Sequence, residues 1–201
     1  EILIRLDLEA VFNHSQFNFQ FISQRPDTGY AIRLSVRPFF REVNMTDVNA
    51  GREALEYRKR YRGVIGVSPK IPIKDAKILS LVYTPGVAAP CMAIARDPVQ
   101  SYLLSCRGNT VGILTDGSGL FRLGHAGPEA ALPVMEGKAV IFKTFAGIDA
   151  LPICLRTKDP YEFIDTALAL SPTFGAFCLE DIASPQRFTI FRLRLCFPVA
   201  R

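Results

Sequence analysis

The chain has 201 residues, of which 49% are hydrophobic, so it is long and apolar enough to bury one substantial core and is not a disordered or fibrous protein. No apolar run approaches the roughly 18 to 20 residues of a membrane span, and the first residues lack the apolar centre of a signal peptide, so we expect a cytoplasmic protein without a membrane partner. The net charge of +5 does not favour a nucleic-acid partner, because residues 1–181 are nearly neutral and nucleic-acid binding needs a basic face on a folded element. The excess lies at Arg187, Arg192, Arg194 and Arg201.

The cysteines argue against both a disulfide framework and a zinc ribbon. There are five of them, an odd number without close paired spacing. We expect reduced and mostly buried thiols at Cys91, Cys106, Cys154, Cys178 and Cys196.

Residues 1–44 differ in pattern from the rest of the chain. Their apolar residues recur at every second position, which predicts two or three short strands without helices. A helical pattern begins near Met45, where Asp47 or Asn49 is placed to cap a helix that Gly63 ends. We therefore interpret residues 1–44 as an atypical β-rich extension, either part of the native protein or an appended segment.

From about residue 80 the chain alternates between helical and strand patterns. Thr84 and Pro85 signal the opening of a helix. Alternation of this kind predicts an α/β fold with a mostly parallel sheet and flanking helices. The predicted strands are 110–115, 150–155 and 175–179, and the predicted helices are 133–145, closed by Gly147, and 160–170, opened by Asp159.

Polar residues follow two of these strands, at the sheet edge where α/β proteins bind ligands. Asp116 and Gly117 follow the first strand, and Glu180 and Asp181 follow the third. Adjacent carboxylates at such an edge are suited to Mg²⁺ or Mn²⁺. The alternatives are a solvated loop for the acidic pair and a phosphate-binding or acidic-ligand site for the turn at Asp116.

Several short strings give this chain a family resemblance. They occur in order over roughly residues 50–190, so the chain resembles the amino-terminal substrate- and metal-binding domain of malic enzymes, in their compact bacterial type. The strings are YTPGVA at 83–88, TDG at 115–117, PVMEGKA at 133–139, FAGIDA at 145–150 and LEDI at 179–182, with the lead-in YRGVIGVSPKIPIKD at 61–75.

The resemblance implies oxidative decarboxylation of L-malate to pyruvate and carbon dioxide, with NAD or NADP as hydride acceptor, by enzymes that act as homodimers. Lys138 would be the general base for the C2 hydroxyl and Tyr83 the general acid that protonates C3. Glu180 and Asp181 would bind Mg²⁺ or Mn²⁺, which stabilises the enolate as carbon dioxide leaves. Without the surrounding motifs, Lys138 reads as a solvated helix lysine and Tyr83 as a core tyrosine.

The chain also departs from the family pattern. A further metal-ligand Asp, found in relatives in a motif like HDDQHGT, does not occur here, and no G-x-G-x-x-G fingerprint follows a predicted strand. We therefore expect residues 45–190 to form the amino-terminal domain alone, truncated before the NAD(P)-binding domain and inactive by itself. The alternative is a catalytically dead fragment or a dimerisation or binding module.

Two local features deviate further. Arg122 and His125 lie in a stretch where bacterial relatives have a glycine and a polar amide, so the turn there is expected to be disturbed. Residues 191–201 alternate apolar and polar residues where relatives have a charged helix, which marks an atypical tail.

Overall fold

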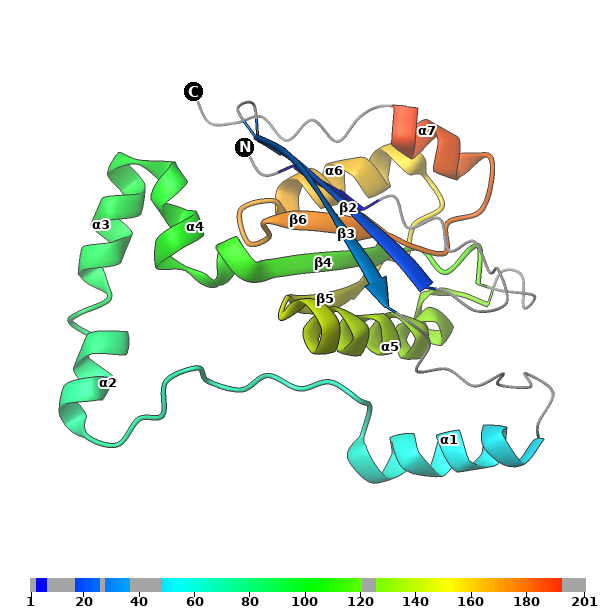
Figure 1. The fold of residues 1–201 in the computed structure, drawn as a ribbon, viewed down its shortest axis with the longest axis horizontal. Helices are drawn as coiled ribbons and strands as arrows, with labels where there is room; N and C mark the ends of the chain where they lie inside the picture. Colours follow the sequence, from blue (N-terminus) through cyan, green and yellow to red (C-terminus); the bar gives the residue numbers. More distant parts are fainter. Residues whose placement is uncertain (1–2, 7–16, 26–27, 37–47, 121–125, 193–201) are drawn as a thin grey trace.

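The computed structural model of the chain describes residues 3–6, 17–25, 28–36, 48–120 and 126–192. Its first sheet is antiparallel, with strand order β1-β2-β3, and Figure 1 shows it as a separate layer in front of the rest of the fold. The short strands predicted within the first 44 residues are thus present in the stretches that the structure describes there. The strands are β1 (Leu3–Leu6), β2 (Phe17–Arg25) and β3 (Thr28–Val36).

The next segment, residues 48–109, is helical and extends away from the parallel sheet formed by the later part of the chain (Figure 1). We call this segment the helical arm. Its helices are α1 (Val48–Tyr61), α2 (Ala76–Val82), α3 (Ala88–Arg96) and α4 (Ser101–Leu104), with short 3₁₀ turns at Pro98–Gln100 and Cys106–Asn109. As predicted, α1 ends just before Gly63, whose N–H donates to the Arg58 carbonyl. The helix expected to open at Thr84 and Pro85 begins at Ala88, after a turn over residues 84–87.

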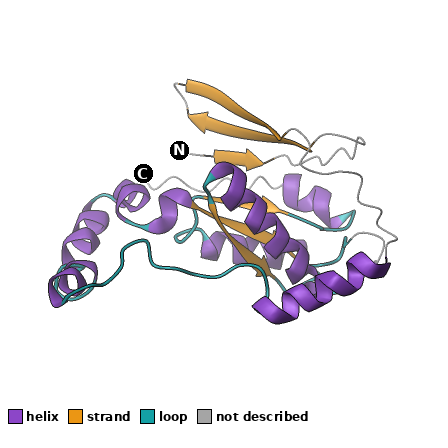
Figure 2. Cartoon of the chain, turned by 60° about the horizontal axis from the view of Figure 1, so that its bottom comes forward, coloured by secondary structure: helices purple, strands orange, loops and turns teal. Residues whose placement is uncertain are grey.

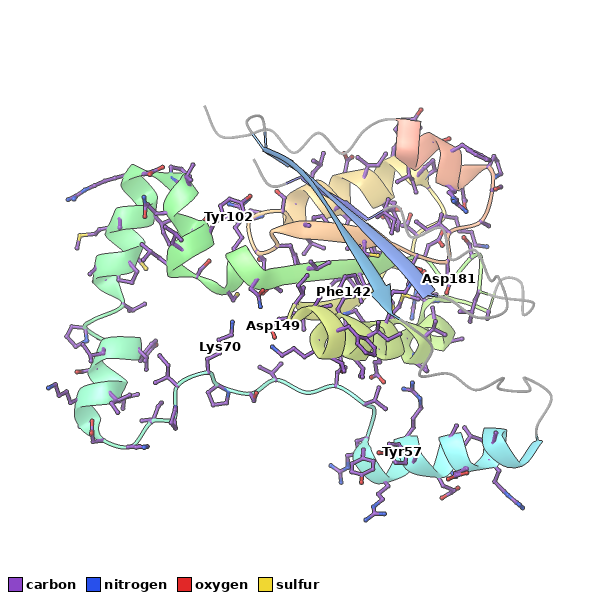
Figure 3. The ribbon with its side chains drawn as sticks, viewed as in Figure 1. Tyr57, Lys70, Tyr102, Phe142, Asp149 and Asp181 are labelled. Carbon is purple, nitrogen blue, oxygen red and sulfur yellow. The ribbon has the colours of Figure 1, made fainter. Side chains whose placement is uncertain are left out.

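Polar contacts tie this helical arm to the rest of the described chain. The Arg58 guanidinium lies 2.6 Å from Glu136 Oε2 and also donates to the Pro133 carbonyl at 2.7 Å. In the loop between α1 and α2, Lys70 points toward Asp149, with Nζ 3.2 Å from Oδ2 (Figure 3).

The second sheet is parallel and has the order β5-β4-β6. Its central strand is buried at every position, as a strand covered on both faces must be. The strands are β4 (Thr110–Thr115), β5 (Asp149–Cys154) and β6 (Ala176–Leu179), which agree with the predicted strands to within one residue.

Helices cover both faces of this sheet (Figure 2). Helix α5 (Pro128–Ala146) packs on one face, and α6 (Pro160–Leu170) and α7 (Gln186–Arg192) lie on the other. Alternate residues of β4 serve the two faces, as the pleat requires. One core contains Val111, Ile113, Met135, Ala139 and Phe142; the other contains Leu114, Phe163, Ala167, Phe174 and Ile190.

The first residue of α6 agrees with the prediction from the sequence, and the first residue of α5 does not. Helix α6 starts where predicted, with the Asp159 carboxylate accepting the Tyr161 N–H at 2.8 Å. Helix α5 starts at Pro128 instead of residue 133. Pro128 suits the first helical position, because a missing N–H costs nothing there, and Pro133 is tolerated one turn later. None of the helices among the described residues is long and apolar enough to cross a membrane.

The expectation of mostly buried cysteines is wrong for the described residues. Cys91 and Cys106 are exposed, Cys154 is half-buried and Cys178 is buried, and all are free thiols. The exposed pair lies in the helical arm, where α3 packs against too little structure to bury its residues. Cys196, Arg122, His125 and the tail from residue 193 onward lie outside the described residues.

Candidate functional site

Two loops meet at the carboxyl edge of the parallel sheet. One is the turn that follows β4, and the other carries Glu180 and Asp181 after β6. The Glu180 N–H extends the ladder by donating to the Leu114 carbonyl at 2.9 Å, and the Gly119 N–H donates to the Asp181 carbonyl at 2.7 Å. Residues about sixty positions apart in the sequence therefore share one site.

Lys138 reaches this edge from the middle of α5. Its Nζ forms an ion pair with Glu180 Oε2, and the side chains are only 19% and 14% exposed. The other oxygen, Oε1, lies 3.2 Å from the Cys178 thiol, which donates to it. Both oxygens of the Glu180 carboxylate thus have protein partners, which fixes its orientation.

Asp181 is half-buried beside this pair, at the carboxyl edge of the sheet (Figure 3). Burial raises the pKa of its carboxyl group, the negative charge of Glu180 raises it further, and the Lys138 ammonium acts in the opposite direction. Its backbone has a φ of 49°, in the left-handed region that a non-glycine residue rarely adopts. Strained backbone and concentrated negative charge often mark functional sites.

The turn after β4 is held by side chains of its own. Asp116 and Ser118 are buried, and Asp116 Oδ1 accepts both the Ser118 N–H at 2.9 Å and the Ser118 hydroxyl at 2.6 Å. The same hydroxyl oxygen accepts the Ala183 N–H at 2.8 Å. Gly117 has a φ of 66°, and a Cβ there would lie 2.3 Å from the Gly127 carbonyl oxygen, so this turn needs a glycine.

Sequence patterns pointed to Asp116 and Gly117 at this edge but not to Ser118 or Cys178 as members of the site. The D-x-S spacing is a local signal for Ser118, because an Asp side chain commonly accepts the N–H two residues on. A local signal for Cys178 is its place two positions before Glu180 at the end of a strand, which puts the two side chains on the same face.

Tyr83 does not join the other candidate residues. It caps the carboxyl end of α2 and is 67% exposed, and α2 lies away from the parallel sheet in both Figure 1 and Figure 2. Within one chain, Lys138, Glu180 and Asp181 are brought together and Tyr83 is not.

The donor set suits a hard divalent cation. The adjacent carboxylates of Glu180 and Asp181 offer the oxygen ligands that Mg²⁺ and Mn²⁺ prefer. These cations bind through one or two protein carboxylates and keep several waters or substrate oxygens as their other ligands. Over the described ranges there is no cluster of three or more His, Cys, Asp or Glu side chains that could hold a metal.

The structure thus defines an α/β domain with an acidic pair and a lysine at the carboxyl edge of its parallel sheet. The sequence profile described as "Malic enzyme, N-terminal domain" matches residues 63–161, and the relatives below extend the similarity. The chain belongs to the malic enzyme family through this domain.

Similar proteins include the NAD-dependent malic enzyme of Geobacillus stearothermophilus, 53% identical over 64% of this chain and 27% of that enzyme. The bifunctional malic/malolactic enzyme of Bacillus subtilis (strain 168) is 50% identical over 69% of this chain and 34% of that enzyme. The crystal structure of the malic enzyme from Pyrococcus horikoshii superposes with a TM-score of 0.68 at 46% identity, covering 72% of this chain and 34% of that one. The chain therefore spans about a third of the relatives it matches.

Proposed function

We propose that this chain supplies the substrate- and metal-binding part of a malic enzyme, which converts L-malate to pyruvate and carbon dioxide with NAD or NADP as hydride acceptor. The observation that carries the proposal is the contact between Lys138 and Glu180 beside Asp181, at the sheet edge of a malic enzyme domain. In this proposal a proton acceptor lies next to two cation ligands.

Each residue has a distinct role in this proposal. Glu180 and Asp181 hold Mg²⁺ or Mn²⁺, which supplies positive charge to stabilise the negative charge that develops on the C2 oxygen of the substrate. Lys138, in its neutral amine form, takes the proton of the C2 hydroxyl while hydride leaves from C2. Tyr83 donates a proton to C3 after carbon dioxide departs. Cys178 and Ser118 do not meet the substrate.

The proposal includes a homodimer formed through the helical arm. Neither α2 nor α3, as described, has a buried residue, and several large apolar side chains exposed along one segment favour an interaction site. A second copy is the occupant we favour, because Tyr83 must come near a Lys138 to act and does not do so within its own chain. The exposed apolar side chains include Leu55, Val67, Ile73, Leu81 and Met92.

Sedimentation velocity tests the dimer. We expect Leu81→Glu, at a side chain 64% exposed, to give a monomer. The matched control is Phe188→Glu in α7, where the side chain is 65% exposed but lies outside the arm; it should remain dimeric. A parent chain that is monomeric at tens of micromolar would refute the dimer.

A thermal-shift titration tests the metal and substrate site. A ligand that binds only the native state raises stability by mass action, so oxalate, a chelating dicarboxylate, should raise the melting temperature only when Mn²⁺ is present. The double variant Glu180→Gln with Asp181→Asn should abolish this coupled shift. The same shift in the variant would place the metal elsewhere.

The chain by itself should not reduce NAD or NADP with malate and Mn²⁺, because no glycine-rich dinucleotide fingerprint occurs in its sequence. Absorbance at the NAD(P)H maximum measures this directly. A second candidate function, a binding module without turnover, is favoured by the exposed position of Tyr83. It predicts a dimer without the oxalate-dependent shift.

A further inference from the structure

We propose that Ser118 is a positioning residue for the acidic pair: its hydroxyl group fixes the backbone of the loop that carries Asp181, and thereby holds the Asp181 carboxylate in place beside Glu180. The inference rests on the proposed metal site at these two carboxylates. It assigns to Ser118 a contribution to cation affinity without contact with the cation.

The Ser118 side chain links the two loops of the site. It is 7% exposed. Its hydroxyl donates to Asp116 Oδ1 at 2.6 Å and accepts the Ala183 N–H at 2.8 Å. Only a group with both a proton and a lone pair can join a carboxylate acceptor to a backbone donor. Asp116 is 8% exposed and also accepts the Ser118 N–H, so the anchor itself is fixed.

The loop is held on both sides of its strained residue. Before it, the Glu180 N–H donates to the Leu114 carbonyl at 2.9 Å. After it, the Asp181 carbonyl accepts the Gly119 N–H at 2.7 Å, and the Ser118 hydroxyl accepts the N–H of Ala183. A Cβ on Gly119 would lie 3.0 Å from the Asp181 and Ile182 carbonyl carbons, so the two backbones are in direct contact. Among the described non-glycine residues only Arg62 and Asp181 have positive φ.

This arrangement has a consequence for the carboxylate. A left-handed residue tends to return to a common backbone conformation unless its surroundings prevent it. If Asp181 relaxes, its side chain turns away from Glu180, and the two carboxylates no longer converge on one cation. Groups that orient metal ligands typically contribute about 10- to 100-fold in metal affinity.

The experiment measures Mn²⁺ affinity of the intact chain in the presence of oxalate, from the electron paramagnetic resonance signal of free Mn²⁺. We expect Ser118→Ala to weaken affinity by about 10- to 100-fold. The control is Ser101→Ala. Ser101 is 8% exposed, and its hydroxyl likewise donates to a carbonyl and accepts a hydrogen bond, here from Arg107. It lies in α4, however, and not in the two loops of the site. Ser101→Ala should bind Mn²⁺ like the parent chain.

A second pair of variants separates the hydroxyl group from the shape of the side chain. Ser118→Thr and Ser118→Val add the same bulk and differ only in the hydroxyl. Ser118→Thr should bind Mn²⁺ at least about 10-fold more tightly than Ser118→Val, with both measured on the folded fraction. This difference keeps the test valid even if Ser118→Ala folds poorly.

The outcomes are distinct. Equal affinity of the Thr and Val variants, or of Ser118→Ala and the parent, overturns the positioning role while leaving the metal site intact. A loss of thermal stability without a loss of affinity does the same. If the parent does not bind Mn²⁺, or Glu180→Gln with Asp181→Asn binds it as well as the parent does, the metal site itself is wrong and the role of Ser118 falls with it.

Discussion

The Lys138 ammonium in the middle of α5 pairs with the Glu180 carboxylate just beyond β6. The pair joins the helix layer to the carboxyl edge of the sheet, at the place where the proposed chemistry occurs. Because both side chains are mostly buried, each depends on the other for its charge partner. The contact is therefore both a structural bond and the centre of the candidate site.

We predict that Lys138→Met lowers the stability of the metal-free chain. It leaves the Glu180 carboxylate with only the Cys178 thiol as a partner, and an incompletely satisfied buried charged group costs about 1–3 kcal/mol. Urea unfolding measures this loss. The matched control is Lys143→Met, one helical turn or so later in α5, where the lysine is 59% exposed and pairs with Asp149. Such surface pairs contribute about 0.2–1 kcal/mol, so equal losses in the two variants would contradict a special role for the Lys138 pair.

Much of the fold was predictable because local signals coincide with packing. The strand at 110–115 reads as a short apolar run, and Asp159 with Pro160 marks the start of α6. In the arm, α3 was expected from Thr84 and Pro85, although it begins a few residues later, whereas α2 and α4 were not predicted, because neither buries an apolar face whose periodicity would reveal it.

The site was predictable only in part. Motif resemblance pointed to Lys138, Glu180 and Asp181, and the structure brings these three together. The bond from the Ala183 N–H to the Ser118 hydroxyl joins two loops that are far apart in the sequence, and no local pattern specifies such a contact. The separation of Tyr83 from Lys138 could not be predicted from the sequence either, because a motif gives residue types and not the distance between residues in space.

Asp149 should make the stability depend on pH in the acid range. Its hydrogen bond from Lys143 lowers the pKa of its carboxyl group, against an opposing effect of burial, and Lys70 and Asn109 add to the lowering. A group with a lowered folded-state pKa stabilises the fold above its unfolded pKa and loses that contribution as pH falls through the folded pKa. Asp149→Asn should therefore lower the melting temperature at pH 7.

The difference between the parent and Asp149→Asn should shrink below about pH 4, where the unfolded carboxyl group becomes protonated, and should approach zero well below that pH. Melting curves at pH 7, 5 and 3 measure it. Glu56→Gln is the control, because Glu56 forms an exposed pair with Lys59 within α1 and should change little. A difference for Asp149→Asn that grows as pH falls would contradict the sign of this prediction.

The thiols should differ sharply in reactivity. Cys91 and Cys106 are exposed, whereas burial and the nearby Glu180 charge raise the pKa of the Cys178 thiol well above its usual value. Because the thiolate is the reactive form, iodoacetamide should modify Cys91 and Cys106 in the native chain and Cys178 only in urea. Mass spectrometry of digested samples reads out each site. Modification of native Cys178 as fast as Cys106 would show that the β6 edge opens readily.

Asp181→Asn should make the metal-free chain more stable while removing its metal binding. Burial and the negative charge of Glu180 raise the pKa of Asp181, so the ionised carboxylate is less favourable in the folded chain than in the unfolded one. For a raised carboxyl pKa, stability falls as pH rises from the unfolded pKa, about 4, to the folded value, and the penalty remains at pH 7. Asparagine removes the charge and tolerates the left-handed backbone as well as aspartate does.

We expect the melting temperature of Asp181→Asn in EDTA at pH 7 to rise by about 1–4 °C, and the gain to vanish near pH 3.5. Asp181→Ala removes the same charge but tolerates positive φ less well, so it should melt below Asp181→Asn. Glu180→Gln should act in the opposite direction, because it breaks the ion pair with Lys138. A rise in melting temperature for Asp181→Asn and a fall for Glu180→Gln would separate the two carboxylates. Asp181 would then serve function at a cost in stability, whereas Glu180 would also stabilise the fold. If Asp181→Asn melts at a lower temperature than the parent chain at pH 7, this prediction is wrong. The ionised Asp181 carboxylate would then have a partner in the metal-free chain that stabilises the fold.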